Sequence, residues 1–324
     1  MAKAMTGTGT ELDPYVVYCY ADLMEKVQES GVYIKIGADI GDLADESDAD
    51  WICDMRWSCA KVYSDNPHGV KLRNITIRQN NIALFNIVKS CILENIHFEN
   101  IIVTYSSSEK TLILNDDCPL IIKQCSFHFT HDGRPGNVTI FSSRSRATLS
   151  LSSCEVTYNI INYTSTDGPL YIHKINESSG VSYITINDVR YNINVPFVDW
   201  VFWFQGPYYS YESHITITNA YILGKSATAF AWFDDIPSAE NSSLKQQCCY
   251  AAWESPSIEL PVCSKDTSTT HYITRCFFDK TLITSPPTDT VLAKTPGILA
   301  LSTEQCKDIN VLTDVDGLNW QITS

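Results

Sequence analysis

One short pattern recurs along the chain and limits what it can fold into. It reads apolar, any residue, small polar, small apolar, any residue, larger apolar. Seven copies occur, at Leu72–Ile77, Leu93–Phe98, Ile122–Phe127, Leu151–Val156, Ile186–Tyr191, Ile217–Ile222 and Ile273–Phe278. Their central apolar residues are 21, 29, 29, 35, 31 and 56 residues apart. The last step is close to two periods, which predicts a degenerate copy around residues 244–252. Such repetition indicates stacked repeats.

The pattern predicts a strand, a corner and a second strand in every copy. Each apolar–any pair alternates at period 2, which is the strand signature. Two polar positions in a row interrupt the alternation, and Asn or Asp there tolerates a left-handed backbone. The spacing is too short for repeated strand–helix–strand units, and the intervening segments lack a helical stripe. Stacked coils would pair each strand with its equivalent one coil away and bury a continuous apolar column.

The cysteines fit that column. Twelve cysteines occur, Cys248 and Cys249 are adjacent, and no Cys-x-x-Cys pair is present, so the spacing matches neither a disulfide scaffold nor a metal template. Cys125, Cys154 and Cys276 fall on the central apolar position of their copies. We therefore expect free thiols that act as small core residues, in preference to a redox or metal role. No cofactor and no metal are expected.

The two ends differ from the repeat and predict caps. Residues 14–18 and 32–36 are expected to form strands that flank a short amphipathic helix over residues 21–29, which ends at Gly31. Ser302-Thr-Glu-Gln305 is a capping-box sequence that opens a second short helix containing Cys306, and the run to Trp320 would close that end. The predicted division is a cap over 1–45, a solenoid over 46–296 and a cap over 297–324.

Aromatic residues concentrate between residues 191 and 254. One interpretation is bulky filling of larger coils or of contacts between subunits. The other is an exposed platform that stacks on sugar rings. The candidate platform residues are Trp200, Trp203, Tyr208, Tyr209, Tyr211 and Trp232.

Charge and composition exclude several classes of protein. Hydrophobic residues make up 44% of the 324, so the chain can bury a core, and the formal net charge of −14 disfavours nucleic-acid partners. No apolar stretch follows Lys3, so no secretory signal peptide is expected. No run approaches the roughly 18 apolar residues of a membrane span, so no membrane insertion is expected.

The N-terminal residues also resemble a known family. Gly7-Thr-Gly-Thr-Glu-Leu-Asp-Pro-Tyr15, the short helix and then Val32-Tyr-Ile-Lys-Ile-Gly-Ala-Asp-Ile40 resemble the cap that precedes pectate-lyase-like parallel β-helices of bacteriophage structural proteins and bacterial surface proteins. The later Asn-Ile-x-Ile/Phe coils are similar to the same families. Repeat and resemblance together predict an all-β fold: a right-handed parallel β-helix of about nine coils with short α/β caps at both ends.

The resemblance implies enzymes to test for, and their motifs are incomplete here. Asp116-Asp117 and Asp234-Asp235 occur without the Gly-His-Gly and Arg-Ile-Lys elements of polygalacturonase-like hydrolases, and each pair reads as a corner. Lys and Arg are sparse for a pectate lyase. His128, His131 and Asp132 form the one compact titratable set, interpreted as a surface turn in preference to a catalytic site. Tailspike-type carboxylates cannot be recognised from one sequence.

The sequence therefore favours a bacteriophage virion structural protein, either a tail spike or fibre or a capsid-surface decoration, that binds a host-surface glycan. Its expected partners are other virion proteins and further copies of itself, in a homotrimer or a higher symmetric assembly, and its expected location is the virion. The alternative is a polysaccharide-degrading enzyme, a tailspike-type depolymerase or lyase on the same fold. A bacterial adhesin fragment is the third hypothesis. Whether the chain is an enzyme stays open.

Overall fold

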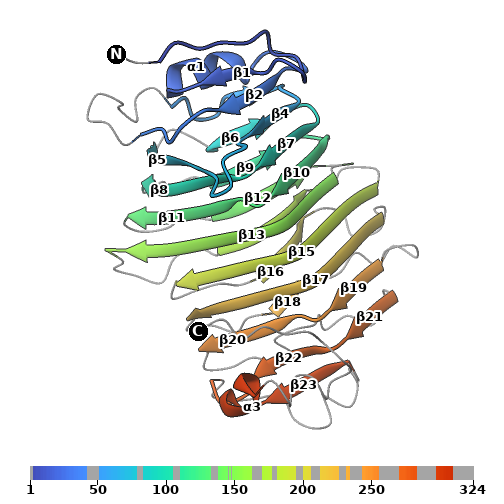
Figure 1. Ribbon diagram of the computed structural model, residues 1–324. Helices are drawn as coiled ribbons and strands as arrows, with labels where there is room; N and C mark the ends of the chain where they lie inside the picture. Colours follow the sequence, from blue (N-terminus) through green and yellow to red (C-terminus); the bar gives the residue numbers. More distant parts are fainter. Residues whose placement is uncertain are drawn as a thin grey trace.

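The chain forms an elongated stack of strands in a computed structural model (Figure 1). The structure describes residues 3–41, 51–78, 83–104, 110–132, 138–144, 146, 148–162, 170–176, 181–194, 200–205, 212–225, 231–233, 243–254, 270–282 and 297–308. Sequence runs from one end of the stack to the other, with helix α1 (Tyr20–Lys26) at the start and helix α3 (Thr303–Lys307) at the end. All ladders between the named strands are parallel, so the predicted parallel β-solenoid is confirmed for this part of the chain.

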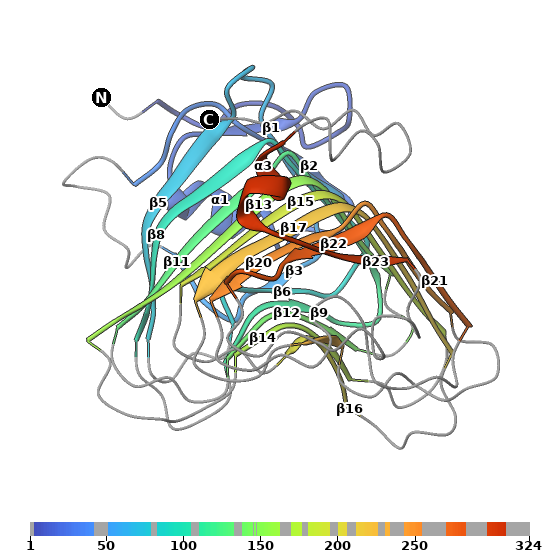
Figure 2. The same cartoon turned by 90° about the horizontal axis from the view of Figure 1, so that it is seen from below.

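The larger of two sheets is bent into two arms (Figure 2). The first arm precedes the corner and contains β1 (Tyr15–Val17), β2 (Tyr33–Ile36), β4 (Lys61–Tyr63), β7 (Cys91–Glu94), β10 (Pro119–Lys123), β19 (Ser243–Gln247) and β21 (Thr270–Thr274). The second arm follows it and contains β5 (Val70–Ile77), β8 (Ile96–Thr104), β11 (Ser126–Asp132), β20 (Tyr250–Glu254), β22 (Cys276–Asp279) and β23 (Ile298–Leu301). Three long strands, β13 (Thr148–Ile161), β15 (Val181–Asn194) and β17 (Glu212–Lys225), run through both arms.

The smaller sheet lies across the open side of the two arms (Figure 2). Its strands are β3 (Arg56–Trp57), β6 (Phe85–Ile87), β9 (Lys110–Asn115), β12 (Val138–Arg144), β14 (Leu170–Asn176), β16 (Trp200–Gln205) and β18 (Ala231–Phe233). Its apolar side chains join those of both arms in one core cluster. A solenoid interior is therefore enclosed by three faces.

A ladder of left-handed residues makes the corner between the arms. Asn95, Gln124, Ser153, Asp188, Asn219, Cys248 and Arg275 have φ between 52° and 61°. The polar interruption in the repeat therefore does mark a bend, as predicted. Asn, Asp and other small polar residues tolerate this region best, because a branched or bulky side chain would clash with the backbone there.

The first copy of the repeat is registered differently from the prediction. Ile75 pairs with Ile101, and the residue that pairs with Ile96 is Val70. The corner of that coil is Gly69, with φ +72°, immediately before Val70. Asn74 forms another left-handed bend that stacks on Asn100, whose Nδ2 donates to Asn74 Oδ1 at 2.7 Å. The 21-residue step was wrong because this coil has two left-handed bends, at Gly69 and Asn74, and the repeat pattern matched the one at Asn74 and not the corner.

The interior column is built as expected from small apolar anchors and stacked rings. Cys125, Cys154 and Cys276 are buried free thiols, which confirms their assignment to the core. The degenerate copy is confirmed as well: β19 and β20 flank a corner at Cys248, and Cys249 takes the buried anchor position. Rings stack one coil apart beside these anchors, with the centroids of Phe98 and Phe127 5.0 Å apart.

Both predicted caps contain their helices. Strands β1 and β2 flank α1 and pair with each other, and β2 pairs on to β4, so the first cap continues the sheet. The Ser302 hydroxyl accepts from the Gln305 backbone while the Gln305 side chain accepts from the Ser302 backbone, which is the capping box expected ahead of α3. Residues 309–324, with Trp320, lie outside the described residues. The three-part division of the chain stays a prediction.

Two histidines lie inside the core rather than on a turn. His131 is 1% exposed on β11, and its Nδ1 lies 2.8 Å from the Tyr158 hydroxyl. The buried His173 on β14 makes the same kind of bond, at 2.8 Å, with Tyr191. The interpretation of residues 128–132 as a surface turn was wrong, because they belong to strand β11 and alternate between interior and exterior.

A β-branched residue at the corner should destabilise the solenoid. Asn219 is exposed in the left-handed region, whereas Thr218 beside it is an ordinary strand residue. We expect Asn219→Val to lower the free energy of unfolding by about 1–3 kcal/mol, because a left-handed non-Gly residue is strained by that order. Thr218→Val should change it by less than about 0.5 kcal/mol. Chemical denaturation followed by circular dichroism measures both, and equal losses would contradict the strain argument.

The buried histidines should make the fold acid-sensitive. Burial lowers the pKa of His131 from 6.5 to about 4, with help from nearby Lys110, and burial lowers the pKa of His173 to about 3. The unfolded chain therefore binds more protons between pH 6.5 and 4, and stability present above pH 6.5 is lost as the pH falls through this window. The His131 contribution is about 3 kcal/mol at roughly 1.4 kcal/mol per pKa unit.

The measurement is the free energy of unfolding between pH 7.5 and 4. His131→Gln should flatten its pH dependence, whereas His128→Gln, on the exterior of the same strand, should leave the dependence unchanged. A wild-type protein whose stability does not change over this window would refute the assignment.

Candidate functional site

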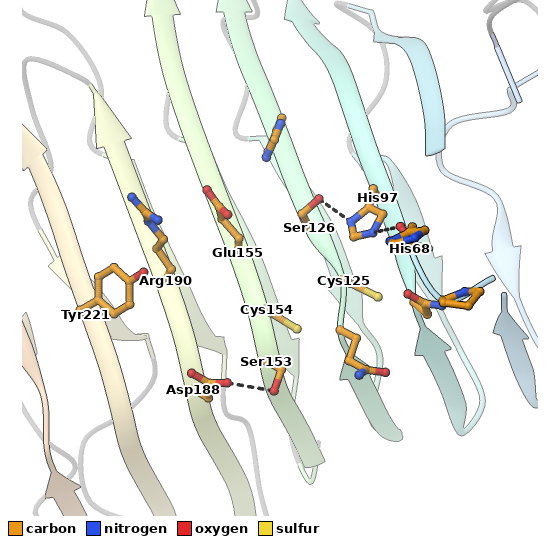
Figure 3. A pocket seen from close by; sticks show the side chains of 14 residues that line it. His68, His97, Cys125, Ser126, Ser153, Cys154, Glu155, Asp188, Arg190 and Tyr221 are labelled. Carbon is orange, nitrogen blue, oxygen red and sulfur yellow. Dashed lines mark hydrogen bonds between the residues drawn. The ribbon is translucent and has the colours of Figure 1, made fainter. Parts of the chain in front are cut away.

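A groove follows the outer side of the corner (Figure 3). Its volume is about 550 Å³, and residues from six consecutive coils contribute to it, from Pro67 to Tyr221. We call it the corner groove. One row of its lining consists of the corner residues Asn95, Gln124, Ser153 and Asp188. A second row lies two residues further along each coil and consists of His97, Ser126, Glu155, Arg190 and Tyr221.

The second row is set by strand register. His97 pairs with Ser126, Ser126 with Glu155, Glu155 with Arg190 and Arg190 with Tyr221. Neighbouring strands lie about 4.8 Å apart, so five different polar or aromatic groups follow one another at that interval along the solenoid axis. The groove thus has a direction, parallel to the axis.

One end of the groove is held by His97. Its Nδ1 lies 2.9 Å from Ser126 Oγ and its Nε2 lies 3.2 Å from the His68 carbonyl oxygen. The Asn95 amide anchors the loop beneath by donating to the carbonyl oxygens of Ser64 and Asn66 at 3.1 and 2.6 Å. Hydrogen bonds to neighbouring coils therefore fix the side chains at this end of the groove.

The charged part of the groove is organised by Asn192. Its Nδ2 donates to Glu155 Oε1 at 2.8 Å, and its Oδ1 accepts from Arg190 Nε at 3.1 Å. The Arg190 guanidinium also lies 5.4 Å from the centre of the Tyr221 ring. Asn192 therefore fixes one edge of each charged group, and the Arg190 guanidinium also packs over the Tyr221 ring.

A second carboxylate enters from the corner row. Asp188 Oδ2 accepts from Ser153 Oγ at 3.0 Å, across one coil (Figure 3). Glu155 and Asp188 come from neighbouring coils, and Arg190 stands two residues from Asp188. The groove therefore combines negatively charged hydrogen-bond acceptors, a planar cation and the half-buried ring of Tyr221.

The floor contains two unreactive thiols. Burial raises the pKa of Cys154 to about 11 and also raises that of Cys125. Both sulfur atoms point at backbone carbonyl oxygens, of Lys123 and Ser152, at 3.2 Å. A thiol is nucleophilic only as its thiolate, so neither cysteine is an activated nucleophile.

The Ser126–His97 pair looks like a nucleophile and base, and the repeat gives it a simpler origin. His214 Nδ1 lies 2.8 Å from Ser243 Oγ, in the same relation of one coil, on the other arm and outside the groove. A hydrogen bond between His and Ser side chains at paired positions of adjacent coils therefore recurs in this solenoid and does not by itself indicate a catalytic pair. Within the described residues, no three His, Cys, Asp or Glu side chains come together as metal ligands.

The arrangement suits a ligand rich in hydroxyl groups. Carboxylates accept two hydroxyl hydrogens, Arg and Asn donate, and the Tyr221 ring offers a face for C–H groups. Pyranose rings present both kinds of surface. An extended chain of such rings repeats at about the spacing between coils, so successive sugars could meet successive rows.

The predicted aromatic platform is not tested by this geometry. Trp200 and Trp203 lie on β16 and Trp232 on β18, but their side chains are outside the described residues, as are Tyr208, Tyr209 and Tyr211 entirely. Asp117 is a left-handed corner residue between β9 and β10, as predicted for Asp116-Asp117, and Asp234-Asp235 lies outside the described residues. Of the titratable set, His128 lines the groove, Asp132 ends β11 and His131 is interior.

Sequence reasoning missed the second row, although the repeat contained its signal. His97, Ser126, Glu155, Arg190 and Tyr221 occupy the unspecified position after the central apolar residue of five consecutive copies. That position points outward beside the corner in every coil. A comparison of these residues down the aligned copies would have shown two charged groups, a histidine and a tyrosine side by side.

Comparisons with known proteins do not show a family for this chain. No family model matches the chain. No curated protein matches it. A solved structure described as "a putative immunoglobulin A1 protease from Bacteroides ovatus" is similar over 95% of this chain and 89% of its own, at 14% identity and a TM-score of 0.37. Fold and groove together define the chain as a parallel β-solenoid with a polar, aromatic-edged groove along its corner. No helix that the structure describes is long and apolar enough to cross a bilayer.

The groove floor can be tested by alkylation. At pH 8 a thiol with a pKa of about 11 is ionised to on the order of one part in a thousand, and burial also blocks the reagent. We expect iodoacetamide to leave Cys154 and Cys125 unmodified in the folded protein and to modify both in guanidinium chloride. Peptide mass spectrometry reads each site. Rapid modification of Cys154 in the folded protein would show that the floor of the groove is open.

Proposed function

We propose that this protein is a bacteriophage virion structural protein, a tail spike, fibre or capsid-surface decoration, that binds a host-surface glycan through the corner groove. The location is the virion, and the partners are other virion proteins and further copies of the chain in a symmetric assembly. Three features support the proposal: the resemblance of residues 7–40 to the caps of such proteins, the parallel β-solenoid, and the groove.

We also propose the finer architecture, a right-handed β-helix of about nine coils. The path through the larger sheet from β4 to β23 supports the coil number, because it passes through nine strands that the structure describes. Right-handed crossing between parallel strands is the strong preference of L-amino-acid chains, which supports the hand.

The observation that best supports glycan binding is the second row of residues in the corner groove. Glu155, Arg190 and Tyr221 stand on three successive coils, each oriented by a contact with a neighbour. Preorganised polar groups beside an aromatic face bind sugars without losing much side-chain entropy. The axial direction of the row favours a polymer over a single sugar.

A polysaccharide-degrading enzyme is the second candidate, favoured by Glu155 and Asp188. These two carboxylates reach the same groove from neighbouring coils. Glycoside hydrolysis needs two carboxyl groups on either side of the scissile bond. The two candidates share the groove and the ligand class, and they differ in whether the bound polymer is cut.

Binding and cutting can be separated with five variants. Arg190→Ala and Tyr221→Ala should each weaken binding to a bacterial surface polysaccharide, selected on a glycan array, by about tenfold, which corresponds to roughly 1.4 kcal/mol. Tyr183→Ala removes an exposed ring on the first arm, outside the groove, and should have no effect. Glu155→Gln and Asp188→Asn should leave the size distribution of the polysaccharide unchanged in a chromatographic assay, because the wild-type protein leaves it unchanged too.

Shortening of the polymer by wild-type protein, abolished by Glu155→Gln or Asp188→Asn, would establish the enzyme instead. Loss of binding in Tyr183→Ala equal to that in Tyr221→Ala would refute the groove as the site. An antibody against the protein should label purified phage particles, and its failure to do so would refute the virion assignment while leaving glycan binding intact.

A further inference from the structure

The second row of the corner groove continues along the solenoid beyond the groove itself. Strand register extends it, one residue per coil, as Tyr221, Tyr250, Phe277 and Leu299. All of these positions follow the central apolar residue of their coil by one, or pair with a residue that does, so they lie on one line parallel to the axis. The length of the groove is therefore set by the elements that cover this line.

Helix α3 covers the row at Phe277 (Figure 1). Phe277 is only 4% exposed, although its two neighbours in strand β22 are the residues that point into the core. It forms a separate apolar cluster with Leu301, and Tyr250 and Cys306 of α3 pack against that cluster. A straight ligand that follows the row therefore meets α3 directly after the half-buried Tyr250.

Hydrogen bonds hold α3 in this position. The buried Asp279 carboxylate accepts from the Thr303 hydroxyl, in the first turn of α3, at 2.6 Å. Its other oxygen accepts from the backbone nitrogen and the hydroxyl of Thr281, at 2.9 and 2.6 Å. The Thr303 backbone nitrogen donates to Thr281 Oγ1 at 3.3 Å. Together with the capping box at Ser302, these bonds fix the start of the helix against the second arm.

A loop stands at the other end of the groove. Strand β4 ends level with β7 and strand β5 begins level with β8, yet residues 64–69 lie between β4 and β5 where the next coil has the single residue Asn95. We call residues 64–69 the corner loop. Residues 65–68 are exposed, and Pro67 and His68 line the groove. The corner loop therefore projects from the corner beside the first open positions of the row.

The corner loop is fixed as firmly as α3. The Gly69 backbone nitrogen donates to the Asn66 carbonyl oxygen at 2.9 Å, and the His68 backbone nitrogen donates to Asn66 Oδ1 at 3.1 Å. The Asn95 amide bonds to the loop from below, and the His68 carbonyl oxygen lies 3.2 Å from His97 Nε2. The loop thus occupies the row at His97, as α3 does at Phe277.

We propose that the corner groove binds the free end of a glycan chain, over about five sugar units, between the corner loop and α3. This inference rests on the glycan binding proposed above. The open row spans four strand steps of about 4.8 Å, or roughly 19 Å, and consists of Ser126, Glu155, Arg190, Tyr221 and Tyr250. An interior segment of a long chain continues at both ends and would meet an obstacle at each. An end segment continues at one end only.

Fragment length is the first test. The probes are linear fragments of the polysaccharide selected on the glycan array, prepared by partial acid hydrolysis and separated by size. Calorimetric titration should show an affinity that rises up to about five units, at one unit per coil, and is constant for longer fragments. Sedimentation analysis should show one protein molecule per chain at every greater length.

A number of bound protein molecules that grows with chain length would overturn the inference and leave the proposed glycan binding intact. Absence of binding to every fragment and to the intact polysaccharide would refute the proposed function, and the inference with it. The two failures are therefore distinguishable in one series of measurements.

Shortening the corner loop is the second test. Deletion of residues 65–69 leaves Ser64 at the corner, where Ser153 shows that serine adopts the left-handed backbone. The row then opens at His97 and at Lys71, which pairs with it. The fragment length at which affinity becomes constant should increase by about two units, one for each position that opens. An unchanged length in a folded deletion variant would overturn the role of the loop.

Two controls accompany the deletion, and thermal melts establish that each variant is folded. Asp65→Asn loses the ion pair with Lys35, as the deletion does, but keeps the loop, so its length dependence should equal that of the wild type. Leu299 is 37% exposed and lies on the row beyond α3. Leu299→Ala should bind every fragment with unchanged affinity, and weaker binding of long fragments would show that the chain passes over α3, contrary to the proposal.

Discussion

In-register pairing of backbone between coils is the constraint on which this structure depends. A parallel ladder can continue for the length of the stack only if each coil repeats the path of the one before it. The corner makes this demand most visible, because one residue in each coil must enter the left-handed region, where few side chains are tolerated. Cys248 and Arg275 occupy it as well as Asn and Asp, which shows that the backbone ladder prevails over local preference.

The same pairing fixes what the interior may contain. Side chains at equivalent positions lie one strand spacing apart, so rings stack on rings and small anchors on small anchors, as Phe98 does on Phe127. Burying a polar group in such a column is costly, and a hydrogen-bond partner offsets part of that cost. His131 with Tyr158 and His173 with Tyr191 provide this by bonding ring nitrogen to hydroxyl inside the core. Because burial lowers their pKa values, both histidines bind protons less readily in the folded chain than in the unfolded chain. The fold therefore loses stability at low pH.

These rules explain which features were predictable. The corner ladder, the core cysteines and the capping box at Ser302 each follow from local chemistry that the repeat or a short motif displays. The register of the first coil does not, because Gly69 and Asn74 both take left-handed backbone and only the pairing with β8 distinguishes them. The groove was not predicted for a related reason. The repeat constrains the inward positions, where similar residues recur, and leaves the outward positions free to vary. An alignment of the copies that looks for recurring residues therefore passes over the outward residues that line the groove.

The outward positions are where one solenoid can acquire separate functions. The outer side of the first arm ends at the residue before the corner, and the second row of the groove begins two residues after the corner. On β15, Asn187 lies on the outer side of the first arm, and Asp188 and Arg190 belong to the groove. Because the sheet bends at the corner (Figure 2), these neighbouring residues of one strand face different directions. A contact on the first arm therefore need not cover the groove.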